Sequence, residues 1–440
     1  MQKRKLLFIV TILVVFILSL TVMQGCKTTA STAAAESTAA AESTASAEKI
    51  TLTFWSHTGG PQADQLTAWG KEYSELNPNI NVVVENTSGD EYLGSKLTAA
   101  FAAGAGPDVF TMSPSFLLNY ANNGIAMDLS SYFTDELKAD FLRSSLDGVT
   151  VGGKIIALPM EIETVGLYYN KDMLAAANIE PPKTWNELVD ATKKLTTDKV
   201  AGLIIEPTKG AYQNFTWYPF MWQGNGEAIN IAEKKGTFEG PAVVNALQLW
   251  ADLIKAGAPK KTVAGTWEFD LLGNGEAAMQ FGGCWGPDIL ESTYPKTNIG
   301  VVPLPIPEGG KQATVAGGWK LVVNSKSAHA EEAAKFAFWM FGDKDISRPL
   351  TWNTVTKFAY SPRKSVTEAG KDVYEKGLRA VFTNEIYATA ITEPRYPGEI
   401  VNAIGDAIQE SMFGTLSAQD AAKKANDKIN EFIKTYDGEF

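Results

Sequence analysis

The chain has 440 residues, a formal net charge of −11, 45% hydrophobic residues and 20% charged residues. This composition is typical of a globular protein of two or three domains, and it excludes global disorder. The acidic balance repels phosphate backbones, so we expect no nucleic-acid partner. Only two histidines are present, His57 and His329. This count excludes multi-histidine metal sites, and no other cofactor is expected.

The N-terminal residues have the pattern of an export signal. Residues 3–5 are basic, and residues 6–20 form an apolar run that is short for a transmembrane helix. The sequence VMQGC, which ends on Cys26, resembles a bacterial lipobox. The resemblance implies a signal peptide at 1–25, a lipid on Cys26 and a protein anchored outside the cytoplasmic membrane. An uncleaved anchor is the alternative.

Residues 26–48 begin with Cys26 and continue with a repeated AAAEST unit that has no aromatic or large aliphatic side chain. Such a segment cannot bury enough apolar area to order itself. It predicts a flexible linker that lifts a folded domain off the membrane.

Strand and helix patterns alternate at the start of the folded part. We expect a strand at 50–56, a helix ending at 77, a strand at 80–84, a helix at 91–103 and a strand at 107–110. This order favours a parallel sheet with helices on both faces. Ligands of such sheets bind at the carboxyl ends of the strands, which places His57 and Ser113 at the candidate mouth.

The rest of the chain continues as an α/β protein with a helical C-terminal end. Thr184 and Glu187 form a capping box at a helix start. Further strands are expected at 155–159, 164–169, 276–282, 298–304 and 314–324, and further helices at 241–256, 331–342, 395–412 and 417–435.

Several segments together carry a family resemblance. They include ITLTFWSHTGG at 50–60, KLTAAFAAGAGPDVF at 96–110, GGKIIALPMEIETVGLYYNKDML at 152–174 and VAGGWKLVVNSKSAHAEEAAKFAFWM at 315–340. In this order the chain resembles the extracellular solute-binding proteins of ABC importers. It is most similar to their sugar and oligosaccharide branch, which includes maltose-binding proteins. The resemblance covers nearly all of 49–440.

The resemblance implies a two-lobe fold of the periplasmic-binding-protein type with hinge crossovers. Lobe one would contain 49–160 plus 314–355, and lobe two would contain 165–310 plus 360–440. The implied protein is a monomer without enzymatic activity. It would bind a carbohydrate ligand by hinge closure and deliver it to the transmembrane subunits of an ABC permease, which a cytoplasmic ATPase drives.

Sugars present flat C–H faces, so aromatic side chains are candidate contacts. Trp285 and Trp319 stand in glycine-rich loops, and Gly318 would let the backbone approach a ligand. Trp217 and Trp222 lie on a helix that the family places at the cleft. In contrast, Trp69, Trp250 and Trp339 have helical spacing typical of core residues, and Trp185 and Trp267 are expected to be structural.

Sugars also present hydroxyl groups, which polar side chains can bind. Glu161 and Glu163 lie two residues apart, so both point to one side of an extended segment. The family pattern places a ligand-contacting glutamate at Glu163. The strand ends add His57 and Ser113. The family pattern further suggests Asp90, before a helix, and Arg395 with Tyr396, before the long C-terminal helix.

Other functions remain open at this point. Paired carboxylates and tryptophans also describe a glycosidase, although neighbours on one strand face cannot easily flank a glycosidic bond. A sugar-binding adhesin or sensor would use the same cleft. Within the family, a glycerol-phosphate ligand would need convergent basic residues, whereas a cationic ligand would suit tryptophans and carboxylates.

Overall fold

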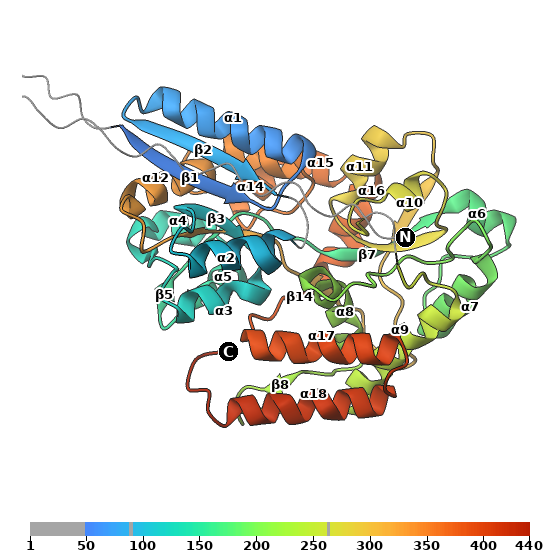
Figure 1. The fold of residues 1–440 in the computed structure, drawn as a ribbon. Helices are drawn as coiled ribbons and strands as arrows, with labels where there is room; N and C mark the ends of the chain where they lie inside the picture. The colour runs from blue at the N-terminus through green and yellow to red at the C-terminus, as the bar shows by residue number, and fades with distance from the viewer. Residues whose placement is uncertain (1–48, 88–90, 262–264) are drawn as a thin grey trace, which may run out of the picture. The chain divides into compact units, whose positions relative to one another are not determined.

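The computed structural model describes residues 49–87, 91–261 and 265–440 (Figure 1). Its first elements are β1 (Ile50–Ser56), α1 (Gly60–Leu76), β2 (Ile80–Asn86), η1 (Tyr92–Lys96), α2 (Leu97–Ala102) and β3 (Val109–Met112). β1 pairs in parallel with both β2 and β3. The predicted β-α-β-α-β unit is therefore confirmed.

Two distant strands complete this sheet. β6 (Leu158–Pro159) and β13 (Lys320–Val323) extend it to the order β2-β1-β3-β13-β6. β13 runs antiparallel to both neighbours, so the sheet is mixed and not purely parallel as predicted. The reason is that β13 enters at the edge where β3 ends, with Lys320 in register with Met112. The residues before β13 therefore lie at the carboxyl ends of β1 and β3.

Helices cover both faces of this sheet. Phe54 is in register with Val109, so Phe54 and Phe110 point to opposite faces. Phe54 packs on Phe336 of α12 (Ala330–Phe341), and Phe110 packs on Tyr120 of α3 (Pro114–Asn122). The remaining elements here are η2 (Ser130–Tyr132), α4 (Asp135–Asp140), α5 (Arg143–Asp147), β4 (Thr150–Val151), β5 (Lys154–Ile155) and α13 (Ser347–Thr351).

The buried hydrophobic residues form two clusters, and we name the two lobes after them. The cluster of lobe one draws on 52–160 and 321–352. The cluster of lobe two draws on 162–315 and 358–433. Lobe two has a sheet in which β7 (Val165–Asn170) lies between the antiparallel strands β10 (Met279–Gly283) and β11 (Ile299–Val302).

Helices dominate the rest of lobe two. They are α6 (Lys171–Ala176), α7 (Trp185–Leu195), α8 (Ala211–Gln223), α9 (Pro241–Ala256), α10 (Asp270–Gly273), α11 (Gly286–Thr293), α14 (Lys364–Ala369), α15 (Lys371–Tyr374), α16 (Gly377–Val381), η4 (Phe382–Ile386), η5 (Tyr387–Thr389), α17 (Gly398–Met412) and α18 (Ala418–Ile433). Lobe two also contains a small hairpin of β8 (Ile229–Asn230) and β9 (Lys235–Gly236). The capping box of Thr184 and Glu187 begins α7, as predicted.

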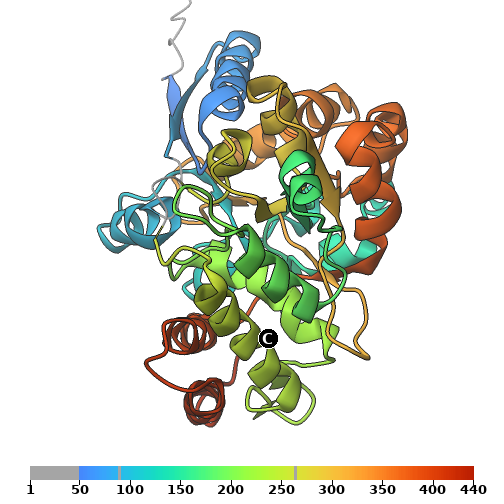
Figure 2. The same cartoon turned by 90° about the vertical axis from the view of Figure 1, so that its right-hand side faces the viewer.

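Backbone contacts connect the segments that pass between the lobes. β12 (Thr314–Ala316) pairs in parallel with β14 (Ala390–Thr392), and Ile162 forms an antiparallel bridge with Tyr360 after η3 (Trp352–Thr356). Figures 1 and 2 show α17 and α18 side by side at the C-terminal end. None of the helices in the described part of the chain has the length and hydropathy needed to cross a membrane.

Candidate functional site

A cavity of about 600 Å³ lies between the two lobes. Lobe one contributes the residues after β1 and β3, and lobe two contributes the start of α8 and the residues around α10 and α11. Its walls are formed by His57, Thr58, Gly59, Gly60, Pro61, Gln62, Ser113, Glu163, Ala211, Tyr212, Phe215, Trp267, Glu268, Asp270, Trp285, Ile289, Gly318, Trp319, Lys357 and Glu393.

The wall of lobe one is an aromatic stack. The His57 imidazole lies face to face with the Trp319 indole, with centroids 3.3 Å apart and planes 7° apart. The His57 Nδ1 atom lies 3.1 Å from the Thr111 hydroxyl oxygen, which also accepts the His57 backbone N–H. Burial and the charge of Lys357 hold the pKa of His57 well below its usual value, so the ring is neutral at pH 7.

Gly318 allows the backbone to place Trp319 in the cavity wall. Its φ of +92° is a conformation that side chains disfavour, and a Cβ atom there would lie 2.6 Å from the Glu161 carbonyl oxygen. Glycine thus allows the crossover to pass close to Glu161 and to turn Trp319 toward the cavity.

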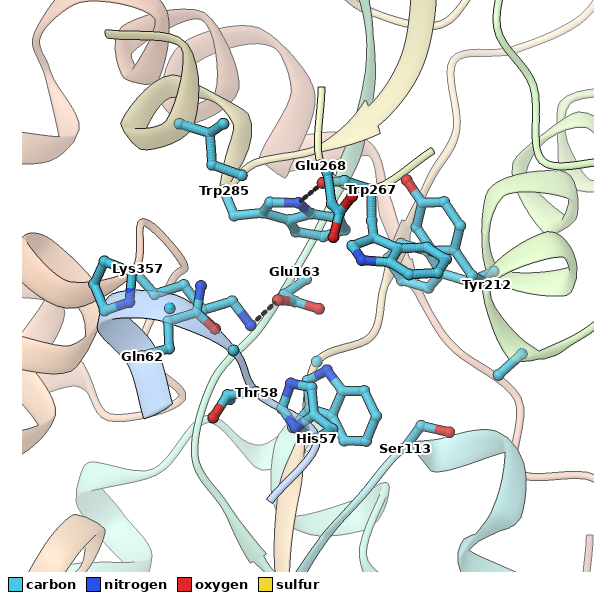
Figure 3. A pocket seen from close by; sticks show the side chains of 18 of the residues that line it. His57, Thr58, Gln62, Ser113, Glu163, Tyr212, Trp267, Glu268, Trp285 and Lys357 are labelled. Atoms are coloured by element: carbon cyan, nitrogen blue, oxygen red, sulfur yellow. Dashed lines mark hydrogen bonds and ion pairs between the residues drawn. The ribbon is translucent and has the colours of Figure 1, made fainter. Parts of the chain in front are cut away.

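The wall of lobe two is also aromatic. The Trp285 indole N–H donates to the Trp267 carbonyl at 2.9 Å, and the Trp285 ring lies near Tyr212 and Phe215, with centroid distances of 6.1 and 6.5 Å. A Cβ atom at Gly283 would meet the Trp285 ring at 1.8 Å, so glycine is needed there for the ring to fold back. Figure 3 shows Trp285 and Trp267 across the cavity from His57, with Glu163 between them.

Glu161, Glu163 and Lys357 form a buried charge cluster at the crossovers. The Lys357 ammonium lies 2.7 Å from Glu161 Oε1 and forms a second ion pair with Glu163 Oε1. Trp352 donates its indole N–H to Glu161 Oε2 at 2.6 Å. Burial raises the pKa of Glu163 to about 7, because it outweighs the attraction of Lys357 and is reinforced by the charge of Glu161.

Two further buried charged side chains, Glu393 and Lys320, lie beside this cluster. The Ser115 hydroxyl donates to Glu393 Oε1 at 2.5 Å, and the Lys320 ammonium donates to the Gly318 carbonyl at 2.6 Å. Burial raises the pKa of Glu393 to about 7 despite the opposing effects of Ser115 and Lys320. Burial also lowers the pKa of Lys320 to about 8, although nearby glutamates oppose this change.

Two polar atoms of the cavity lack a partner within the described part of the protein. The Ser113 hydroxyl and the Tyr212 hydroxyl are buried and make no hydrogen bond there. Burying such groups without a partner is costly, so they suit a ligand that brings its own donors and acceptors. The site thus combines two aromatic walls with a few polar groups, an arrangement suited to binding. No cluster of three or more potential metal ligands occurs among the described residues.

Comparison with known families identifies the chain. The model of the bacterial extracellular solute-binding protein family matches residues 59–346. The chain belongs to this family. A probable ABC transporter-binding protein of Deinococcus radiodurans is 28% identical over 336 residues, which are 71% of this chain and 74% of that protein.

Two further similarities extend this result. The maltotriose-binding protein of Pyrococcus abyssi is 24% identical over 315 residues, which are 68% of this chain and 64% of that protein. The crystal structure of an ABC transporter solute-binding protein from Thermotoga lettingae, bound with α-D-tagatose, has a TM-score of 0.77 and 24% identity. The matched region covers 87% of this chain and 100% of the Thermotoga chain. The fold is therefore the expected two-lobe fold of solute-binding proteins.

The structure brings half of the predicted site residues together. These residues line the cavity: His57, Ser113, Glu163, Trp285, Gly318 and Trp319. Two other predictions, the lipid-bearing Cys26 and the ligand contact Asp90, lie outside the described residues.

Five predicted contacts do not line the cavity. Trp217 and Trp222 are buried in the core of lobe two, because α8 is buried on all sides from Gln213 to Gln223. Glu161 is fully buried, and both of its oxygens have protein partners. Arg395 donates to the Thr150 carbonyl, and Tyr396 is buried in the same core as Trp217.

Sequence reasoning missed several residues of the cavity. Tyr212 and Phe215 are one helical turn apart at the start of α8, and this spacing was the available signal. Trp267 was expected to be structural, yet it lines the cavity beside Trp285. Lys357 and Glu393 had no local signal, because their partners Glu161 and Ser115 are 196 and 278 residues away.

Proposed function

We propose that the protein is the substrate-binding lipoprotein of an ABC importer and captures a neutral mono- or oligosaccharide between its lobes. The observation that carries the proposal is the pair of aromatic walls, His57 with Trp319 and Trp285 with Trp267, on opposite sides of one cavity. Flat walls suit the C–H faces of a sugar ring, and Glu163 between them suits its hydroxyl groups.

The ligand would pass to a membrane permease with a cytoplasmic ATPase. Membership of the family supports this role, as do the similarities to a maltotriose-binding protein and to a solute-binding protein bound with tagatose. In this proposal the protein acts as a monomer and performs no reaction on the sugar. In support of the latter, Glu161 and Glu163 share one lysine, whereas the two carboxyls of an inverting glycosidase must flank the bond.

The lipid anchor is part of the same proposal. The signal pattern at 1–25 and Cys26 would place the protein outside the cytoplasmic membrane, with 26–48 as a linker. Mass spectrometry of the membrane fraction is expected to find a diacylglyceryl modification on Cys26. Cys26→Ser is expected to release the protein from that fraction.

The alternative ligands differ in charge. Lys357 is the only lysine or arginine among the described residues of the cavity wall, and its ammonium is already paired with two glutamates. A phosphate-bearing ligand would therefore find no free cation there. A cationic ligand would compete with Lys357 for the same carboxylates.

A thermal-shift screen of the full chain tests the proposal. The panel contains neutral mono- and oligosaccharides, glycerol-phosphates and polyamines. A ligand that binds only the folded state raises the unfolding midpoint by mass action, and we expect this only for neutral sugars. A response to phosphates or polyamines alone would overturn the proposed ligand class while leaving the family unchanged.

A further inference from the structure

The backbone places Lys357 against two glutamates that are distant in sequence. Ile162 and Tyr360 exchange backbone hydrogen bonds of 2.7 and 2.9 Å across their antiparallel bridge. Glu161 and Glu163 flank Ile162 in an extended segment, so their side chains point to the same side. Lys357 lies just before Tyr360 on the opposite segment and reaches both carboxylates.

All three charged side chains are removed from water. The exposed fraction of the side chain is 5% for Lys357, 0% for Glu161 and 7% for Glu163. The Lys357 ammonium also lies 5.8 Å from the centroid of the Trp285 ring. A buried ammonium between two carboxylates and an indole face is the environment that a cationic ligand would require.

The other buried lysine has different partners. Lys320 donates to the backbone carbonyls of Gly317 and Gly318 and forms no ion pair with a described carboxylate. Among the described residues, Lys357 is therefore the cation that pairs directly with both Glu161 and Glu163. Figure 3 shows the Lys357 side chain reaching Glu163 from one side, at the edge of the cavity.

We infer that Lys357 is a specificity-determining residue, an internal cation that occupies the cation site of the cavity and makes it select uncharged ligands over amine-bearing ones. The inference deepens the proposed sugar-binding function and rests on it. An incoming ammonium group meets a site that is already filled, and it would have to displace a covalently attached competitor. A neutral hydroxyl group can donate to the Glu163 carboxylate without displacing Lys357.

Replacing the internal cation with a soluble one tests this inference. Lys357→Ala removes the ammonium, and n-propylammonium matches the atoms that the substitution removes. We would titrate the full-length variant with n-propylammonium chloride at constant ionic strength and follow its unfolding midpoint. The expected result is a saturable rise, with an apparent Kd at least about tenfold lower than in the unsubstituted protein.

Two controls separate this effect from general stabilisation. 1-Propanol has the same length without the charge and is expected to have no effect. Lys320→Ala removes an equally buried ammonium that donates to backbone carbonyls and makes no direct ion pair with a described carboxylate, and it is expected to gain no affinity for the probe. Exposed acidic side chains at the mouth of the cavity, such as Glu268, are present in every variant, so they contribute the same background binding of n-propylammonium.

A second variant keeps the inference testable if Lys357→Ala does not fold. Lys357→Met fills the space of the side chain without its charge. This variant should gain affinity for n-propylammonium, which would bind from the cavity side against Glu163 and Trp285. If neither variant binds the probe more tightly than the unsubstituted protein, the inference is wrong. The probe contains no sugar. A gain in probe affinity together with an absent sugar response would therefore refute only the proposed function.

Discussion

The Trp319 indole lies flat on the His57 imidazole, with ring centroids 3.3 Å apart. The imidazole is held from behind by the Thr111 hydroxyl, at 3.1 Å from Nδ1. The ring that faces the ligand is thus supported by a second ring, which the end of β1 holds in place. This support fixes the orientation of Trp319 before any ligand enters.

The first prediction concerns this support. His57→Ala is expected to weaken binding of the sugar found in the screen by about 1 kcal/mol, because Trp319 loses the ring that holds it. His57→Phe keeps a flat ring and is expected to restore most of the affinity. Isothermal titration of both variants measures the difference. Equal losses in the two variants would show that the imidazole nitrogen, and not the stacking, is what the ligand requires.

Trp285 is expected to contribute from the opposite wall. Trp285→Ala should weaken sugar binding by about 1.5 kcal/mol or more, the order expected for a lost aromatic contact with a ligand. Trp339 provides the control, because it stacks with Arg348 on lobe one and does not line the cavity. Unchanged affinity after Trp285→Ala would remove this residue from the site.

Glu161 and Glu163 are expected to differ although they are close in sequence. Glu161→Gln leaves Lys357 with one carboxylate fewer in a buried place, so the free energy of unfolding should fall by about 3 kcal/mol with little effect on affinity. Glu163→Gln should instead lower affinity by about 1.5 kcal/mol or more, because Glu163 lines the cavity. Urea unfolding and isothermal titration of both variants separate the two effects. The opposite pattern would exchange their roles.

Glu393 is expected to make stability depend on pH. Burial raises the pKa of this carboxyl to about 7 in the folded protein, whereas in the unfolded chain the carboxyl has its ordinary pKa of 4.5. Between these values the folded state binds more protons, so stability falls as pH rises. His57 acts in the opposite sense below pH 6.5, because its pKa is lowered in the folded state.

Comparing variants isolates the Glu393 effect. Glu393 should lower the free energy of unfolding by about 2 kcal/mol between pH 5 and pH 7, and this decrease should be absent in Glu393→Gln. Glu399→Gln, the same substitution at an exposed residue, is the control. Urea unfolding at both pH values provides the measurement. An identical profile for Glu393→Gln and the unsubstituted protein would contradict the raised pKa.

Local patterns in the sequence predicted the elements and part of the site. The alternation of Ile50, Leu52 and Phe54 identified β1, and the strand order placed His57 and Ser113 at the cavity. Trp285 and Trp319 were identified from the glycines beside them. In each case the signal lies within a few residues, because the turn or strand that positions the side chain is local.

The remaining residues depend on contacts that no local pattern contains. Trp217 and Tyr212 are on the same helix, and only the packing of α8 decides that Trp217 faces the core while Tyr212 faces the cavity. Lys357 acquires its role from a bridge between two crossovers that are distant in sequence. Lys357 and Glu161 are 196 residues apart. The sequence therefore indicated an acidic site, and the structure adds a lysine that pairs with both Glu161 and Glu163.

Gly318 provides a last prediction, in which strain and contact can be separated. Gly309→Ala places a side chain at a φ of +71° with nothing within 4 Å, so it should cost about 1 kcal/mol of stability from strain alone. Gly318→Ala adds a clash, because its Cβ would lie 2.6 Å from the Glu161 carbonyl oxygen. It should therefore cost about 2 kcal/mol more. It should also weaken sugar binding, since Trp319 must move with the backbone, whereas Gly309→Ala should leave affinity unchanged. Urea unfolding and isothermal titration of both variants measure these differences. Equal losses of stability would mean that the crossover can move away from Glu161 at no cost.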